Sequence, residues 1–274
     1  MELVRNISIG VYVDTDSAIH RLDPRLKILI LAALMILVFV FTRWHEFMVL
    51  FALLVFVAIL SRIPLRFIWR GFRMILFFIL LAVVFNLFLT RGGDVIFSWR
   101  FITITTEGAK LAGLMAARLI ILVLGTSLLT LTTSYLQLTD ALESLLKPFR
   151  RIGVPAHEIA MMMTIALRFI PTLLEETEKI IKAQTSRGAE FDQGNIIKRV
   201  RLLLPILIPL FVHAFRVAED LAVAMEARCY RGGEGRTRLR QLVFTRTDLA
   251  VSIGVILLLG LMTGGEIWFR AVSK

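Results

Sequence analysis

Five apolar segments constrain the fold of this chain more than any other feature of its sequence. They cover roughly residues 26–42, 46–60, 72–90, 109–131 and 249–269. A helix of about 20 apolar residues crosses a hydrocarbon core of ~30 Å. Of all residues, 57% are hydrophobic, which is too apolar for an ordinary soluble domain. We therefore expect an all-α polytopic membrane protein with about five transmembrane helices.

The first of these segments has a recognisable start. Asp23 is a residue type that caps helices, and Pro24 suits the first helical turn. The residues before them are polar and mixed, without the apolar core of a cleavable signal. We expect the first transmembrane helix to begin at this point.

Positive charge predicts how the spans are oriented. The net charge is +11, and the loop 61–73 holds Arg62, Arg66, Arg70 and Arg73 without any acid. Such loops face the cytoplasm, so the N-terminus is expected inside and, with five spans, the C-terminus outside. The loops 43–46 and 91–108 balance their charges, as external loops can. This pattern is typical of a multi-pass membrane protein whose partner is the lipid bilayer and not nucleic acid.

The region between the fourth and fifth spans differs from the rest. It predicts three amphipathic helices, near 135–149, from Pro155 to about 188, and from about 195 to 233. They are too charged to span and too apolar to stay free in water, so we expect them on the cytoplasmic side of the membrane. Prolines should bend or interrupt the last two, at Pro171, Pro205 and Pro209. The predicted domains are 1–131, 132–247 and 248–274.

Two of these helices end in a similar pattern around an arginine. The first reads Ser186-Arg187-Gly188, and forty-one residues later the chain reads Ala227-Arg228-Cys229. A single arginine there is explained by helix-end electrostatics, and glycine ends helices in the left-handed conformation. The repetition points further, because an arginine between small residues suits insertion into a partner's pocket and a forked bond to a carboxylate. Cysteine disfavours positive φ, so the second helix is expected to end later, at Gly232.

The whole chain resembles the transmembrane T component of energy-coupling factor transporters, a branch of the ATP-binding-cassette importers. The resemblance rests on "HRLDPRLKIL", on the spans, on the long amphipathic helices with "LRFIPTL", and on the two arginine motifs. It implies that two coupling helices each insert an arginine into a groove on an ATPase subunit. The implied ATPase-binding residues are Ser186, Arg187, Gly188, Ala227, Arg228 and Cys229; the sequence departs from the Ala-Arg-Gly pattern at Ser186 and Cys229.

The resemblance also implies a function. The chain would couple two cytosolic ATPases, identical or different, to one substrate-binding membrane S component that imports a vitamin, cobalt or nickel. ATP and Mg²⁺ would bind to the ATPases, and this chain would bind no cofactor and catalyse no reaction. In agreement, the sequence contains no GxxxxGK[ST] loop for ATP, and "HEIAM" at His157 lacks the second histidine of a zinc motif.

Further residues stand out. Arg118 lies within the fourth span, where a charge is a functional candidate; it can snorkel, bind backbone carbonyls or meet a cytoplasmic residue. Arg168 is expected to brace helices. The run Met161, Met162 and Met163 suits packing or an adaptable contact for exchangeable S components.

Two other functions remain open from the residues alone. An intramembrane hydrolase would need paired carboxylates or histidines within the spans, and none is evident. A basic membrane scaffold would bind acidic partners through its loops, without special dependence on Arg187 or Arg228.

Overall fold

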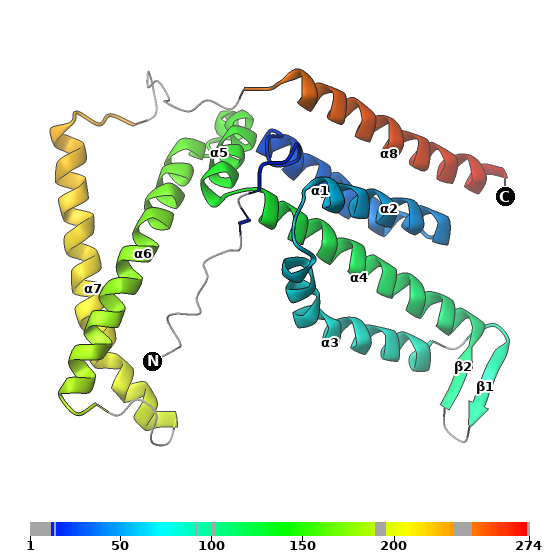
Figure 1. Cartoon of the computed structure of the whole chain (residues 1–274), viewed down its shortest axis with the longest axis horizontal. Helices are drawn as coiled ribbons and strands as arrows, with labels where there is room; N and C mark the ends of the chain where they lie inside the picture. Colours follow the sequence, from blue (N-terminus) through cyan, green and yellow to red (C-terminus); the bar gives the residue numbers. More distant parts are fainter. Residues whose placement is uncertain are drawn as a thin grey trace. The chain divides into compact units, whose positions relative to one another are not determined.

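The computed structural model describes residues 12–13, 15–90, 92–99, 102–189, 196–232 and 243–272 (Figure 1). The chain divides into two compact units. One, called here the core unit, comprises residues 10–141 and 242–274; the other, the helix-pair unit, comprises residues 142–241 with 1–9. The predicted division at residues 131 and 247 concerns location in the membrane and stays a prediction.

The core unit is built around one long helix. Its elements are α1 (Pro24–Val40), α2 (Trp44–Leu60), α3 (Leu65–Leu89), α4 (Thr106–Thr132), the first half of α5 (Tyr135–Leu146) and α8 (Arg246–Val272). The central helix α4 packs against α1, α2 and α3. The core residues come mainly from these helices: Leu34, Val38, Phe41, Phe47, Leu50, Leu54, Ile63, Ile68, Leu114, Ile121, Leu124, Leu128 and Leu131.

Two glycines let neighbouring helices approach α4 closely. A Cβ atom at Gly113 would lie 2.5 Å from the Trp44 ring, and one at Gly125 would lie 2.9 Å from a methyl group of Leu31. Both distances are too short for carbon atoms in contact, so only glycine leaves room for these side chains. The glycines thus fix how deeply α1 and α2 seat on α4.

The prediction of an all-α membrane protein is confirmed, and the number of five spans stays a prediction. Among the described residues, three helices are long and apolar enough to cross a membrane: Thr106–Thr132, Ala156–Ser186 and Arg246–Gly265. A fourth is obtained if the bent helix α3 counts as one span, and Trp44–Leu60 is a shorter apolar helix of 17 residues. Helix α6 (Ala156–Ser186) thus contains a stretch apolar enough to span, although we predict that this helix lies outside the membrane.

The predicted start of the first helix is confirmed, and one predicted loop contains a hairpin. The Asp23 carboxylate accepts a hydrogen bond of 2.8 Å from the backbone N–H of Arg25, and Pro24 is the first helical residue. Within the predicted loop 91–108, strands β1 (Val95–Trp99) and β2 (Ile102–Thr105) pair antiparallel. The sequence "VIFSW…ITIT" is rich in residues that favour strands, which is the signal that marks this hairpin.

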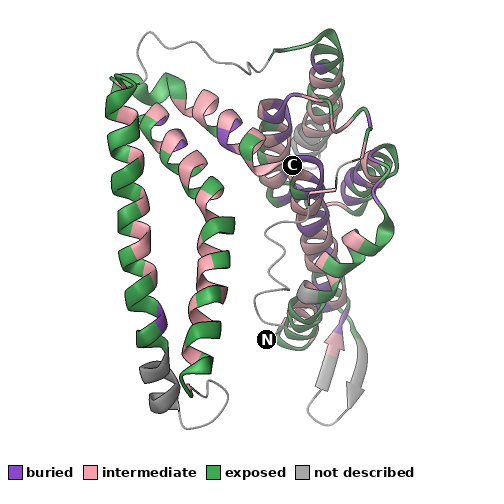
Figure 2. Ribbon diagram, turned by 60° about the vertical axis from the view of Figure 1, so that its left-hand side comes forward, coloured by how far each residue is buried: buried purple, intermediate pink, exposed green. Residues whose placement is uncertain are grey.

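The helix-pair unit contains the end of α5, the short 3-10 helix η1 (Lys147–Ile152), α6 and α7 (Ile196–Ala227). Helices α6 and α7 run antiparallel, and Figure 2 colours most of both as exposed or intermediate. Among the residues of this unit whose burial is described, only Ala156, Ala160 and Ile206 are buried. Both helices continue through their internal prolines, so the predicted interruption does not occur. The unit therefore offers two long exposed helices with little core of their own.

Candidate functional site

The first arginine motif caps the end of α6. The helix ends at Ser186, and Arg187 is its C-cap residue. Gly188 has φ +88°, and its N–H bonds to the Thr185 carbonyl at 3.0 Å, while the Ala189 N–H bonds to the Gln184 carbonyl at 3.0 Å. These two bonds form a Schellman motif, which needs a left-handed residue after the cap. All bonds of this cap are made by the backbone, so the Arg187 side chain is not required for them.

The second motif has the same geometry. Helix α7 ends at Ala227, the Cys229 N–H bonds to the Glu226 carbonyl at 2.8 Å, and the Tyr230 N–H bonds to the Met225 carbonyl at 3.0 Å. Cys229 takes the left-handed position with φ +54°. The expectation that this helix continues to Gly232 was therefore wrong. Because the cap places two backbone hydrogen bonds here, cysteine adopts a conformation that it otherwise disfavours.

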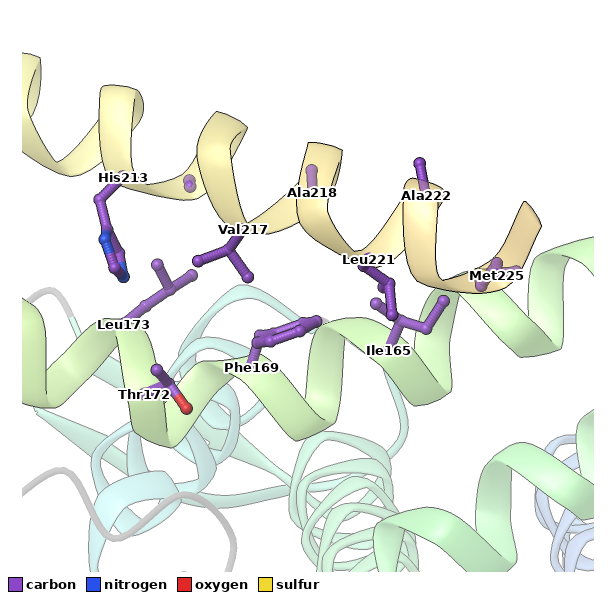
Figure 3. A pocket seen from close by; sticks show the side chains of 11 residues that line it. Ile165, Phe169, Thr172, Leu173, His213, Val217, Ala218, Leu221, Ala222 and Met225 are labelled. Atoms are coloured by element: carbon purple, nitrogen blue, oxygen red, sulfur yellow. The ribbon is translucent and has the colours of Figure 1, made fainter. Parts of the chain in front are cut away.

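The two arginines lie at opposite ends of the antiparallel pair. Met225 lies beside Ile165, and His213 lies beside Leu173 (Figure 3). This pairing places Arg228 near the level of Met162, about 25 residues before Arg187, which corresponds to roughly 40 Å along the helices at 1.5 Å per residue. Both arginines are exposed, and neither makes a side-chain hydrogen bond or ion pair with a residue that the structure describes. Each guanidinium is thus free to bind a separate partner surface.

An apolar groove lies between α6 and α7. It encloses about 270 Å³. Phe169 and Leu173 from α6 and Val217 and Leu221 from α7 point into the space between the helices (Figure 3). The remaining lining residues are Ile165, Thr172, His213, Ala214, Ala218, Ala222 and Met225. The sequence predicted that these helices are amphipathic, but not that α6 and α7 form an apolar groove in antiparallel order.

Arg118 binds backbone carbonyls, one of the three alternatives that its position left open. Its Nε donates to the Val38 carbonyl at 3.0 Å and its terminal nitrogen to the Phe41 carbonyl at 3.4 Å. The guanidinium also stacks over the Phe39 and Phe47 rings at 5.3 and 5.9 Å. The C-terminal carbonyls of α1 have no partner within the helix, and Arg118 supplies one from α4. This geometry is structural; a part in coupling stays a prediction.

The other predicted residues are placed at the surface. Arg168 is exposed and has no side-chain hydrogen bond or ion pair among the described residues, so its bracing role stays a prediction. Met162 and Met163 are exposed near the start of α6, and Met161 is partly buried. None of the three lines the groove. The arginine motifs, the methionines and Arg118 are therefore separate features and not one site.

Sequence reasoning missed a buried polar cluster that joins three helices. Asp248, only 1% exposed, accepts a hydrogen bond of 2.9 Å from the backbone N–H of Asp23 and one of 2.8 Å from that of Thr245. Lys27 is also buried and donates from Nζ to the Thr132 carbonyl at 3.0 Å. The cluster ties the starts of α1 and α8 to the end of α4. Its sequence signal is "TRTD", where Thr245 and Asp248 have the spacing of a helix capping box.

Among the described residues, no three His, Cys, Asp or Glu side chains are grouped as a metal site would require. The pocket beside Arg118, of about 320 Å³, is lined by one carboxylate, that of Glu107, together with Thr42, Lys110, Leu111, Leu114 and Met115.

Cys229→Gly should stabilise the end of α7, and Gly188→Ala should destabilise the end of α6. A left-handed L-residue costs about 1–2 kcal/mol, so glycine at position 229 removes strain and alanine at 188 introduces it. No atom lies within 4 Å of a Cβ built at Gly188, so backbone strain alone determines the second effect. Amide hydrogen exchange at the two helix ends measures both. Changes of the same sign in the two variants would contradict this account of the caps.

Comparisons with known proteins agree with this architecture. The family model described as cobalt transport protein, CbiQ, matches residues 15–239. The energy-coupling factor transporter transmembrane protein EcfT of Thermosediminibacter oceani is 54% identical over 269 residues, which cover 98% of this chain and all of the relative. The protein of the same name from Ruminiclostridium cellulolyticum is 52% identical over 91% of this chain and 93% of its own length. The one from Clostridium kluyveri is 46% identical over 97% of this chain and 99% of its own length. The chain belongs to the EcfT/CbiQ family of transmembrane transport proteins.

Proposed function

We propose that this protein is the coupling subunit of an energy-coupling factor importer. It joins two cytosolic ATPases to a substrate-binding membrane S component and passes ATP-driven motion between them. The observation that carries the proposal is the pair of free arginines, Arg187 and Arg228, held by identical caps at opposite ends of one helix pair. A protein that contacts two similar subunits needs two such contacts, well separated.

Each arginine binds one ATPase subunit. Its guanidinium forms a forked pair with a carboxylate in a groove of the ATPase, while Ser186 and Gly188, or Ala227 and Cys229, are small enough to let it enter. ATP and Mg²⁺ bind between the ATPases, and this chain holds no cofactor and performs no catalysis. Closure of the ATPases around ATP changes the distance between their grooves and so displaces the two helix ends relative to each other.

The helix pair transmits this displacement to the S component. Helices α6 and α7 bury little within their own unit, so they can rotate against each other at low cost. Their exposed apolar surface, with Met161, Met162 and Met163 near the start of α6, suits a membrane partner, and methionine adapts to exchangeable partners. The S component then reorients and releases a vitamin, cobalt or nickel into the cell. The helix pair lies on the cytoplasmic face of the prokaryotic inner membrane, on the same side as the basic loop 61–73.

Co-purification from native membranes tests this proposal. The tagged full-length chain should retain two ATPase chains and one small hydrophobic membrane protein, whose bound ligand identifies the cargo. Hydrolytic activity of the purified chain without partners would instead support an intramembrane enzyme. Acidic partners that dissociate in high salt, with no ATPase present, would support the scaffold.

A further inference from the structure

The start of α3 forms a short amphipathic helix with a basic face. Residues Leu65–Arg73, called here the α3 stub, are bent by 52° from the apolar part Ile75–Leu89. At 100° per residue, Arg66, Arg70 and Arg73 fall within one narrow sector of the stub. The loop 61–73 contains no acid. The stub thus carries concentrated positive charge directly beside the apolar part of α3.

The opposite face of the stub is fixed to the core unit. Ile68 is buried, and Phe67 and Phe72 pack against the core. A Cβ atom at Gly71 would lie 3.2 Å from the hydroxyl oxygen of Ser127, so the stub touches α4 there. Since these residues hold the inner side, the arginines must face away from the protein.

The three arginines have no partner among the described residues. All three are exposed, and none makes a side-chain hydrogen bond or ion pair there. The charge of Asp16 acts on Arg62, which precedes the stub. Arg21 already binds Asp16 with two hydrogen bonds of 2.9 and 2.8 Å, which lowers the pKa of that carboxyl. Within the described part of the chain, the charge of the stub is therefore not neutralised.

Two large apolar side chains flank the arginine row. Leu65 is 79% exposed and Trp69 is 69% exposed. Both lie between the buried face and the arginine face of the stub. Tryptophan is enriched where the hydrocarbon core meets the headgroups, because one end of its ring system is apolar and the other donates a hydrogen bond. Such a side chain beside an arginine row is typical of a helix lying in the membrane interface.

The stub also lies at the level along α4 where the lipid headgroups are expected. Ser127, which it touches, is five residues before the end of α4 at Thr132. That is about 8 Å along the helix, close to the boundary of the membrane core if α4 spans it. The arginines therefore reach the headgroup layer, while the adjoining part of α3 enters the hydrocarbon.

We propose that the α3 stub binds anionic phospholipid headgroups, with Arg66, Arg70 and Arg73 on the phosphates and with Leu65 and Trp69 in the acyl-chain boundary. Guanidinium groups bind phosphate oxygens through paired hydrogen bonds, and basic residues at a membrane surface are attracted to anionic lipid. This site is independent of the ATPase contacts proposed above. Lipid binding at this site sets the depth at which the core unit lies in the leaflet that the basic loop faces.

Quenching of tryptophan fluorescence by brominated lipids tests the site. The full-length chain is placed in bilayers that contain brominated phosphatidylglycerol or brominated phosphatidylcholine at equal molar fraction. The contribution of Trp69 is isolated by comparison with Trp69→Phe. We expect the anionic lipid to quench Trp69 about twofold or more as strongly as the zwitterionic lipid, and high salt to remove the difference. Equal quenching of the wild-type chain by the two lipids would overturn the proposal.

Matched variants separate a specific site from general charge. The triple variant Arg66→Gln, Arg70→Gln, Arg73→Gln should be quenched equally by the two lipids. The control triple Lys182→Gln, Arg216→Gln, Arg231→Gln has the same change in net charge and should keep the stronger quenching by the anionic lipid. Equal loss in both triples would overturn the proposal. The salt titration of the wild-type chain, with Trp69→Phe as its reference, does not use the arginine triple and decides the matter even if that triple fails to fold. If Trp69 is shielded from both lipids in the complex from native membranes, a protein covers the stub and the lipid assignment is wrong.

Discussion

Replacing both Arg187 and Arg228 by alanine should abolish ATP-driven uptake in a reconstituted complex. Loss of one partner of a buried, hydrogen-bonded charge pair costs about 2–5 kcal/mol at an interface. Each single variant should therefore bind its ATPase subunit at least about tenfold more weakly, since about 1.4 kcal/mol corresponds to a factor of ten. Uptake of the cargo into proteoliposomes and affinity for the ATPases are the two measurements.

The distance between the arginines sharpens this prediction. Substitutions that are far apart and share no partner act additively in free energy. With the two tips roughly 40 Å apart on the helix pair, the affinity losses of the single variants should multiply in the double variant. Uptake should not follow this multiplication. Transport needs the displacement of both helix ends, so either single substitution already uncouples uptake from ATP.

Two neighbouring residues provide controls with the same loss of charge. Lys182 lies on the last turns of α6, and Arg231 follows the cap of α7; both are exposed and unpaired among the described residues. Lys182→Ala and Arg231→Ala should leave affinity and uptake near wild type, because exposed charges contribute little. The caps remain intact in every variant, since backbone atoms alone form them. Full uptake by the double variant, or equal losses in the controls, would sink the coupling proposal.

The helices were predictable where local sequence determines them. The apolar runs are long enough to form helices by themselves, and Asp23 with Pro24 sets the start of α1 through local hydrogen bonding. The two arginine motifs were equally visible, because a helix end depends on a few consecutive residues. The hairpin of β1 and β2 was missed between longer apolar segments, although its β-branched residues indicated strands.

Features that depend on tertiary contacts were not predictable. Cys229 is a different, local case: two backbone hydrogen bonds at the cap hold it in the left-handed conformation against its own preference. The antiparallel pairing of α6 and α7, which separates the arginines, follows from contacts between helices and not from the pattern of either one. The partner of Asp248 is the backbone of Asp23, 225 residues away, and no local signal identifies such a pair.

Asp248→Ala should lower the stability of the core unit by roughly 3 kcal/mol, because it leaves the buried N–H group of Asp23 without an acceptor and removes the hydrogen bond that the Thr245 N–H donates at the start of α8. α8 packs only lightly on α1, so the Asp23–Asp248 bond is a main link between the first and last helices. We expect the thermal midpoint of the full-length chain in detergent to fall by about 6–12 °C, at about 2–4 °C per kcal/mol for a chain of this size.

Asp220→Ala is the matched control, since Asp220 is an exposed carboxylate on α7 without a hydrogen bond among the described residues. It removes the same charge and should leave the midpoint nearly unchanged. Asp248→Asn retains one acceptor oxygen, but its amide nitrogen cannot accept from Thr245 while the oxygen accepts from Asp23. Its midpoint should therefore lie between those of wild type and Asp248→Ala. If Asp248→Ala and Asp220→Ala have the same thermal midpoint, the hydrogen bonds of Asp248 do not hold α8 in place. A buried acceptor that stabilises the core unit cannot be removed without lowering that midpoint.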